Sequence, residues 1–321
     1  MTTIRQKTTI LLAGIACVLL LAGVFLAGCT SESIPVQPTA TSAGTAVPET
    51  PTTTAQQEVT TAAPVVTTVA PGPISTPAPA HTSSSGTVVA FTAASLKGVS
   101  PKLAADFEKV YPGHHVVFNL DGTQALKTQI ENGAYADVFI SASNSYTSTL
   151  TGEGYFVNGT VRPLTSNYVI VIIPAANPAN IRSLADLAKP GLKIAMADKS
   201  VPIGTATYAA LANLATSGYN ADWNRSVFRN VVTYDTSEPG VATKVELGEV
   251  DAGFVYESTY TAAPRNAFVA ITIPKGDNYL QTYTIGTLKG SISPGAASMF
   301  ESFMLSATGR QDLRDFGFRP V

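Results

Sequence analysis

The sequence predicts an α/β protein with mostly parallel sheets. From about residue 87 onward, short apolar segments of strand length alternate with amphipathic segments of helix length, which is the pattern of consecutive βα units. Residues 168–173 form an unbroken apolar run, as expected for a strand buried on both faces of a parallel sheet. Residues 87–321, about 235 in number, are enough to form one large core or two lobes.

Turn residues and apolar periodicity define the elements of the first half. Ser100-Pro101 marks the start of a helix, and Pro112-Gly113 stops it, since proline fits the first helical turn but not its interior. Gly133 follows another amphipathic segment and is expected to end that helix. The elements expected here are strands 88–91, 116–120 and 136–142, and helices that start at Ser100 and cover 123–132 and 146–152.

The second half continues the alternation. Ser237 precedes Glu238 and Pro239, which is a typical start of a helix, and residues 201–204 are expected to form a loop. The other elements expected are strands 168–173, 193–197, 231–234, 251–256, 268–273 and 283–288, and helices 184–188, 205–215, 294–306 and 311–316.

The N-terminus has the features of an export signal. Arg5 and Lys7 precede an almost uncharged apolar run over residues 10–27, which closes with Leu-Ala-Gly-Cys at 26–29. This ending matches the lipobox of secreted lipoproteins and implies a signal peptide over 1–28, cleavage before Cys29 and lipidation of its thiol. The alternative is an uncleaved membrane helix, because the run is close to the length of a bilayer span.

Residues 29–86 are expected to be a disordered stalk. They are rich in Thr, Pro, Ala, Ser and Val, and contain no aromatic residue, Lys or Arg. Such a segment cannot bury enough apolar surface to offset its ordering entropy. The composition resembles an O-glycosylated stalk, and a plain flexible spacer is the alternative. Cysteine occurs only at 17 and 29, so the body beyond the stalk has no thiol for a disulfide or a metal.

The charge balance of the body argues against a nucleic-acid binder. Two of the 20 basic residues, Arg5 and Lys7, and three of the 22 acidic residues, Glu32, Glu49 and Glu58, precede residue 87. The body therefore carries 18 basic and 19 acidic residues, whereas a nucleic-acid-binding protein shows a basic face. An anion would have to be captured by local dipoles rather than by a global positive field.

Small and hydroxyl residues follow several of the predicted strands. In open α/β sheets, ligands bind beyond the carboxyl ends of the strands, and helix N-termini there offer free N–H groups to anions. The turns that bring such groups together predict an oxyanion site. The candidate positions are Ser95, Gly122-Thr123, residues 201–204, Ser237-Glu238 and Tyr256.

Four segments of the body resemble the periplasmic molybdate-binding proteins of ABC transporters. They are Phe-Thr-Ala-Ala-Ser-Leu at 91–96, the run at 128–142 that ends in Ala-Asp-Val-Phe-Ile-Ser-Ala, residues 250–256, and Phe-Gly-Phe at 316–318. The resemblance implies a two-lobed type II periplasmic-binding fold with a double-crossover hinge. It implies lobe 1 over 87–166, lobe 2 over 167–274, and a return to lobe 1 over 275–321.

The resemblance also implies a function. The protein would be an extracytoplasmic lipoprotein on the outer face of the cell membrane that captures molybdate, and also tungstate, for an ABC permease and ATPase. We expect a monomer that closes about its hinge, has no catalytic activity and needs no cofactor. Carried over position by position, the first-lobe residues that would bind the oxygens of the molybdenum oxyanion are Ser95, through its hydroxyl and its backbone N–H, and Thr123. Those of the second lobe are Ile203 and Glu238, through backbone N–H groups, and Tyr256, through its phenol.

Two departures from the family pattern bear on the anion. Asp121 precedes the turn at Gly122, where a small neutral residue is usual, so it forms either a local turn contact or an acceptor for a protonated oxyanion such as phosphate. Archaeal relatives add two carboxylates for six-fold coordination, but the matching positions look like Val201 and Val255. We therefore expect plain tetrahedral binding.

Two other functions stay open at this point. The same fold could bind another oxyanion, phosphate or sulfate. Alternatively, Ser95 could be the nucleophile of a secreted hydrolase, but this requires a histidine base, and the body offers only His114-His115. Adjacent histidines on a strand point to opposite faces, so we expect them at a surface or an edge and not at one metal.

Overall fold

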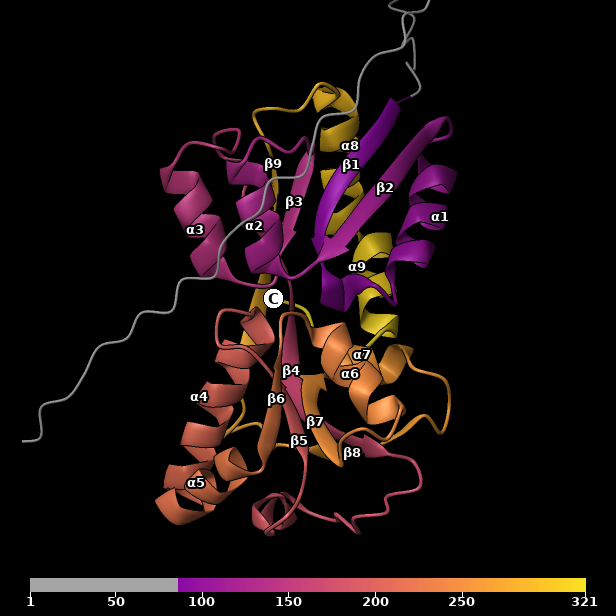
Figure 1. Ribbon diagram of the computed structural model, residues 1–321. Coiled ribbons are helices and arrows are strands. Elements are labelled where there is room, and N and C mark those ends of the chain that lie inside the picture. Colours follow the sequence, from indigo (N-terminus) through magenta and orange to yellow (C-terminus); the bar gives the residue numbers. More distant parts are fainter. Residues whose placement is uncertain (1–85) are drawn as a thin grey trace, which may run out of the picture. The chain divides into compact units, whose positions relative to one another are not determined.

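The computed structural model describes residues 86–321 (Figure 1). The predicted signal peptide, the lipidation site Cys29 and the stalk up to residue 85 lie outside the described residues. Among the residues described, no helix combines the length and apolar character needed to cross a bilayer.

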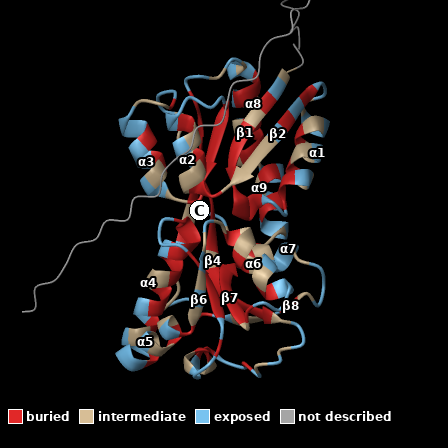
Figure 2. Ribbon diagram, viewed as in Figure 1, coloured by how far each residue is buried: buried red, intermediate tan, exposed pale blue. Residues whose placement is uncertain are grey.

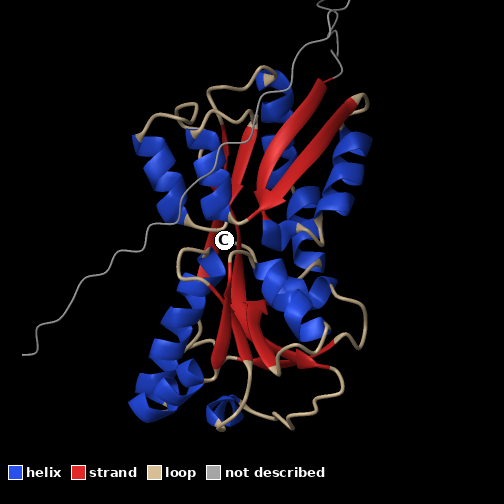
Figure 3. Cartoon of the chain, in the orientation of Figure 1, coloured by secondary structure: helices blue, strands red, loops and turns tan. Residues whose placement is uncertain are grey.

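The first lobe is built on three parallel strands in the order β2-β1-β3. Helices flank these strands (Figure 3), and α8 and α9 from the end of the chain pack in the same lobe. Its elements are β1 (Gly86–Ala93), the 3₁₀ helix η1 (Ala94–Leu96), α1 (Ser100–Val110), β2 (His114–Asp121), α2 (Thr123–Glu131), β3 (Val138–Ser141), α3 (Asn144–Gly152), α8 (Pro294–Leu305) and α9 (Ala307–Asp315).

Two crossover strands join this lobe to the second. The long strand β4 (Arg162–Pro174) pairs with β9 (Leu280–Thr287) through its first half, up to Tyr168, and with strands of the second lobe from Val169 onward. β9 then returns the chain and pairs with β3. The two strands form the double crossover of the type II periplasmic-binding fold, which confirms the predicted fold class.

The second lobe lies beyond this crossover. β5 pairs in parallel with β6 and β7, while β7 and β8 run antiparallel to β4. Its elements are the 3₁₀ helix η2 (Leu184–Ala188), β5 (Ile194–Ala197), α4 (Pro202–Ser217), α5 (Ala221–Arg229), β6 (Val231–Asp235), α6 (Glu238–Glu246), β7 (Ala252–Tyr256), α7 (Glu257–Ala262) and β8 (Phe268–Thr272).

The sheet is mixed to a greater degree than the sequence predicts. Four of the eight strand pairings are antiparallel, and each of them involves β4 or β9. The apolar run at 168–173 belongs to β4, so its assignment to a parallel strand was wrong. Helices on both sides of the sheet bury this strand whatever its direction, and burial rather than direction makes a strand continuously apolar. The predicted lobe boundaries at 166/167 and 274/275 stay predictions.

Three helix assignments also differ. Residues 201–204 are not a loop, because α4 begins at Pro202, where proline occupies the first helical position. Helices α5 and α7 were not expected. The start of α5 carries a recognisable signal, since the Asn220 side chain accepts a hydrogen bond from the Trp223 N–H. Strands and the inner helix faces form the buried interior of each lobe (Figure 2).

Candidate functional site

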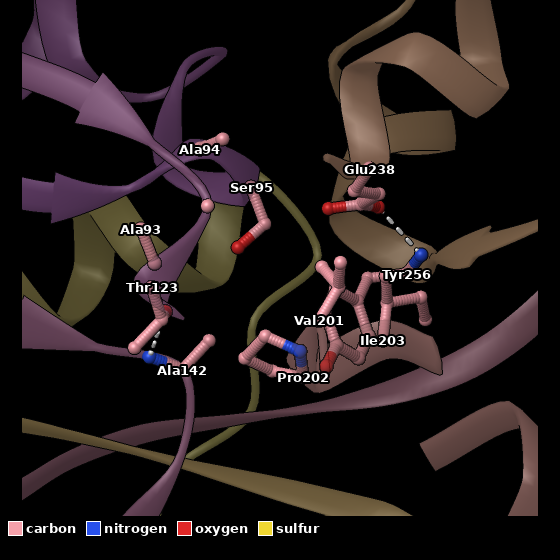
Figure 4. A pocket seen from close by; sticks show the side chains of 11 residues that line it. Ala93, Ala94, Ser95, Thr123, Ala142, Val201, Pro202, Ile203, Glu238 and Tyr256 are labelled. Atoms are coloured by element: carbon pink, nitrogen blue, oxygen red, sulfur yellow. Dashed lines mark hydrogen bonds between the residues drawn. The ribbon is translucent and has the colours of Figure 1, made fainter. Parts of the chain in front are cut away.

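All five residues expected to bind the anion line one small cavity between the lobes (Figure 4). The cavity volume is about 20 Å³, counted as the space open to the centre of a water molecule. On the same measure, a single water needs roughly 10–15 Å³. The site therefore fits a small, compact ligand. Its lining consists of Ala93, Ala94, Ser95, Gly122, Thr123, Ala142, Val201, Pro202, Ile203, Glu238 and Tyr256.

The first lobe contributes two hydroxyl groups. The parallel pairing of β1 and β2 matches Ala93 with Asp121, so the turns that follow these strands emerge at the same edge. Ser95 lies in η1 directly after β1, and Thr123 opens α2 directly after β2. The Thr123 Oγ1 accepts a hydrogen bond from the Ala142 N–H at 3.1 Å. Because the oxygen is engaged as an acceptor, the hydroxyl proton is left to donate to a ligand.

Three helices begin at the cavity without a side-chain cap. The residues before them are Gly122 for α2, Val201 for α4 and Ser237 for α6, and none accepts a capping hydrogen bond through its side chain. First-turn N–H groups such as those of Ile203 and Glu238 therefore lack the usual side-chain acceptor. The helix dipoles add partial positive charge at the same point. This convergence favours an anion in the cavity.

Tyr256 ends β7 and adds a third hydroxyl group. It is 1% exposed, and its Oη has no hydrogen-bond partner among the described residues. Burial raises the pKa of Tyr256 well above its ordinary value, so the phenol keeps its proton at neutral pH. A buried donor left unpaired costs about 1–3 kcal/mol, and a ligand oxygen in the cavity would remove that cost.

The carboxyl that borders the cavity belongs to Glu238 and not to Asp121. Asp121 Oδ1 accepts from the Gly122 N–H at 2.7 Å, and Asp121 is absent from the lining. This is the local turn contact considered from the sequence. Glu238 is 3% exposed, and burial raises its pKa to about 7. The resemblance implies a role only for the backbone N–H of Glu238, whereas the structure also places its carboxyl at the cavity.

Val201 and Val255, which the resemblance matches to the archaeal carboxylates, differ in their relation to the cavity. Val201 lines the cavity, whereas Val255 lies within β7 and does not. Neither side chain carries an oxygen, but the Glu238 carboxyl also borders the cavity, so tetrahedral binding stays a prediction.

Tyr283 was missed by the sequence interpretation. Its Oη lies 2.8 Å from Ser95 Oγ, and it is fully buried on β9, packed against Tyr256 and Phe318. Burial raises the pKa of Tyr283 well above its ordinary value, so it can donate to Ser95 and orient that hydroxyl toward the ligand. Only the return of β9 through the crossover brings Tyr283 here, so no local signal could have found it.

We expect Tyr283→Phe to weaken anion binding by about 0.5–1.5 kcal/mol, the net value of one hydrogen bond. The ring should still pack against Tyr256 and Phe318, so the melting temperature without ligand should change little. Isothermal titration calorimetry would measure the affinity. An unchanged affinity would contradict the role of Tyr283 in orienting Ser95.

The histidine pair does not serve Ser95. His114 begins β2, opposite Gly86, whereas Ser95 follows the other end of the same strand pair. Both histidines lie on β2 at the edge of the sheet, as expected; His114 is buried there, and His115 Nδ1 lies 2.9 Å from Glu108 Oε1. Within residues 86–321, no group of three or more His, Cys, Asp and Glu side chains is placed to hold a metal ion.

Two hydrogen bonds join the lobes beside the cavity. Gln124 Nε2 in α2 donates to the Thr236 carbonyl at 2.7 Å, and the Tyr146 hydroxyl in α3 donates to the Ser200 carbonyl. The cavity itself contains neither Lys nor Arg in its lining. The arrangement can hold a small anion by neutral donors, since hydrogen bonds to a charged acceptor are about twice as strong as neutral ones.

Comparison with known proteins agrees with this geometry. The family model described as bacterial extracellular solute-binding protein matches residues 88–319. The molybdate-binding protein ModA of Mycobacterium tuberculosis H37Rv is 31% identical over 246 residues, which cover 77% of this chain and 89% of ModA.

Two solved structures have the same fold. The substrate-binding domain of a putative molybdenum ABC transporter from Clostridium difficile is 27% identical with a TM-score of 0.57, covering 74% of this chain and 100% of that domain. The Azotobacter vinelandii periplasmic molybdate-binding protein is 21% identical with a TM-score of 0.64, covering 73% and 99%. The chain belongs to the family of bacterial extracellular solute-binding proteins.

Proposed function

We propose that this protein captures molybdate, and also tungstate, outside the cytoplasm for an ABC importer. The observation that carries the proposal is the convergence of three uncapped helix starts and three hydroxyl-bearing side chains on a small cavity without a basic residue. The relatives named for molybdate or molybdenum support this choice of anion. A serine hydrolase is disfavoured because Ser95 contacts a tyrosine and not a histidine.

In this proposal each lobe offers donors to one half of the anion. Ser95 and Thr123 donate their hydroxyls from the first lobe. From the second lobe, Ile203 and Glu238 donate their backbone N–H groups, and Tyr256 donates its hydroxyl. These groups bind the oxygens of the molybdate and make no contact with the metal, because a tetrahedral oxyanion presents acceptors on every side.

Closure of the lobes about the crossover strands would then retain the anion. Gln124 and Tyr146 reach across to carbonyl groups of the second lobe, so these contacts would form when the lobes close. We further propose that the protein acts as a monomer held at the outer face of the membrane through lipidated Cys29, and that the closed form docks on the permease.

Titration calorimetry with molybdate, tungstate, sulfate and phosphate would test the anion. We expect molybdate and tungstate to bind in the micromolar range or tighter, and sulfate to bind more weakly, because it is a smaller ion of the same charge and shape. Binding of phosphate without any binding of molybdate would contradict the proposal.

Phosphate is the second candidate because of one observation. Glu238 Oε2 is buried without a partner among the described residues, and a carboxylate there could accept the proton of a monoprotonated oxyanion. Molybdate carries no proton at neutral pH, so the same carboxyl would have to act differently toward it.

A further inference from the structure

Glu238 is bound through one carboxyl oxygen and free at the other. Its Oε1 accepts from the Tyr256 N–H and from the Thr259 Oγ1, each at 2.7 Å. Its Oε2 is buried and has no hydrogen-bond partner in the described part of the chain. Figure 4 shows that the oxygen not bonded to Tyr256 turns into the cavity toward Ser95 on the opposite side. The free oxygen therefore faces the space that the anion would fill.

Within residues 86–321, no lysine, arginine or histidine side chain is paired with the Glu238 carboxyl, whose hydrogen-bond partners are Thr259 and the Tyr256 N–H. The titratable or charged side chains on elements that pack against α6 or lie near Glu238 are Tyr256 of β7, Asp235 and Tyr234 of β6, Arg162 and Tyr168 of β4, Glu257 and Tyr260 of α7, and Tyr283 of β9, while β5 and η1 carry none. On α6 itself, Lys244 pairs with Asp235, and Glu246 is exposed. Arg319 pairs with Glu257 and also lies over the Tyr168 ring.

A second negative species in the cavity would be costly beside an ionised Glu238. Two like charges a few ångströms apart repel strongly where water is excluded, and a dianion doubles the effect. With a proton on Oε2, the same carboxyl becomes a hydrogen-bond donor to the anion. Burial has already raised the pKa of Glu238 to about 7, so protonating Oε2 near neutral pH costs little free energy.

We propose that Glu238 is an additional ligand of the oxyanion, donating a proton held on its side-chain Oε2, so that capture of a fully deprotonated oxyanion takes up one proton from the solvent. This inference rests on the proposed function. The proton moves from solvent to Oε2 when the anion binds and returns to solvent when the anion leaves. The backbone N–H and the carboxyl of the same residue would thus both contact the ligand.

The sign of the pH dependence follows from this arrangement. The bound state holds the proton more tightly than the free state, so affinity is highest when Glu238 is already protonated. As the pH rises above about 7, the affinity for molybdate should fall by up to about tenfold per pH unit, the slope for uptake of one proton. Below that range the affinity should level off.

Calorimetry of the detergent-solubilised full chain, repeated in buffers of different ionisation enthalpy, measures the protons taken up. We expect close to one proton per molybdate at about pH 8.5 and few at about pH 6. Glu238→Gln keeps an acceptor for Tyr256 and Thr259 and offers an amide donor to the anion, so it should bind molybdate with a flat pH profile and no uptake. Glu246→Gln, on an exposed residue of the same helix, should retain the wild-type profile.

Three results would count against the inference. Wild-type protein that binds molybdate with no proton uptake at about pH 8.5 would overturn it while leaving the proposed function intact, and this measurement depends on no variant. Retention of the wild-type pH profile by Glu238→Gln would also overturn it. Preference for phosphate over molybdate would place the proton on the ligand and make Glu238 an acceptor. A chain that binds neither molybdate nor tungstate at any pH would instead refute the proposed function.

Discussion

Replacing Ser95 by alanine should weaken oxyanion binding by about 1–3 kcal/mol, or roughly 5- to 150-fold in the dissociation constant. The substitution removes a hydroxyl donor from a buried site and leaves an anion oxygen without its partner. It also leaves the Tyr283 hydroxyl, 2.8 Å away, unpaired. Titration calorimetry with molybdate would measure the loss.

Ser100→Ala is the matched control. Ser100 is another buried serine, and its Oγ donates to the Lys97 carbonyl outside the cavity, so its loss should leave molybdate affinity near the wild-type value. Combining Ser95→Ala with Tyr283→Phe should cost less than the sum of the single changes, because the two hydroxyls act as one unit. Wild-type affinity in Ser95→Ala would remove Ser95 from the site.

Gly204→Ala should damage both the fold and the site. A Cβ at this position would lie 1.9 Å from the Asp198 carbonyl oxygen and 2.7 Å from that of Ala197. These are backbone atoms that cannot swing away, so the start of α4 must shift. Overpacking of this kind costs about 1–3 kcal/mol or more, and the shift would displace the Ile203 N–H from the cavity. We expect a lower melting temperature, by about 2–4 °C per kcal/mol, together with weaker molybdate binding.

Gly218→Ala provides the comparison on the same helix. Gly218 follows the last turn of α4 at a φ of −130°, and a Cβ there would meet no atom within 4 Å. This variant should melt at or above the wild-type temperature and bind molybdate as the wild type does. Equal behaviour of the two variants would show that the close approach at Gly204 does not position the helix start.

Local sequence patterns were sufficient to predict most of the helices and strands. Proline in the first turn and glycine after the last turn identified where α2 and α6 begin or end, because those positions require particular backbone angles. Apolar runs located the strands, since each is buried between helices. The direction of β4 could not be read in this way, because burial on both faces gives the same apolar run in parallel and antiparallel strands.

The amino-acid sequence alone identified candidates for anion binding, and resemblance to a family selected Ser95, Thr123, Ile203, Glu238 and Tyr256 from among them. All five line the cavity, although their role as ligands stays a prediction. Residue type and position after a strand are local properties, so this much was accessible without coordinates.

Which carboxyl faces the cavity, and which side chain supports Ser95, depend on tertiary contacts. Asp121 and Glu238 both adjoin helix starts in the sequence, but a contact with the next N–H turns Asp121 away, while two donors fix Glu238 at the cavity wall. Tyr283 lies 188 residues from Ser95 along the chain. Such contacts form because the crossover strands bring distant segments together, and local sequence patterns cannot predict them.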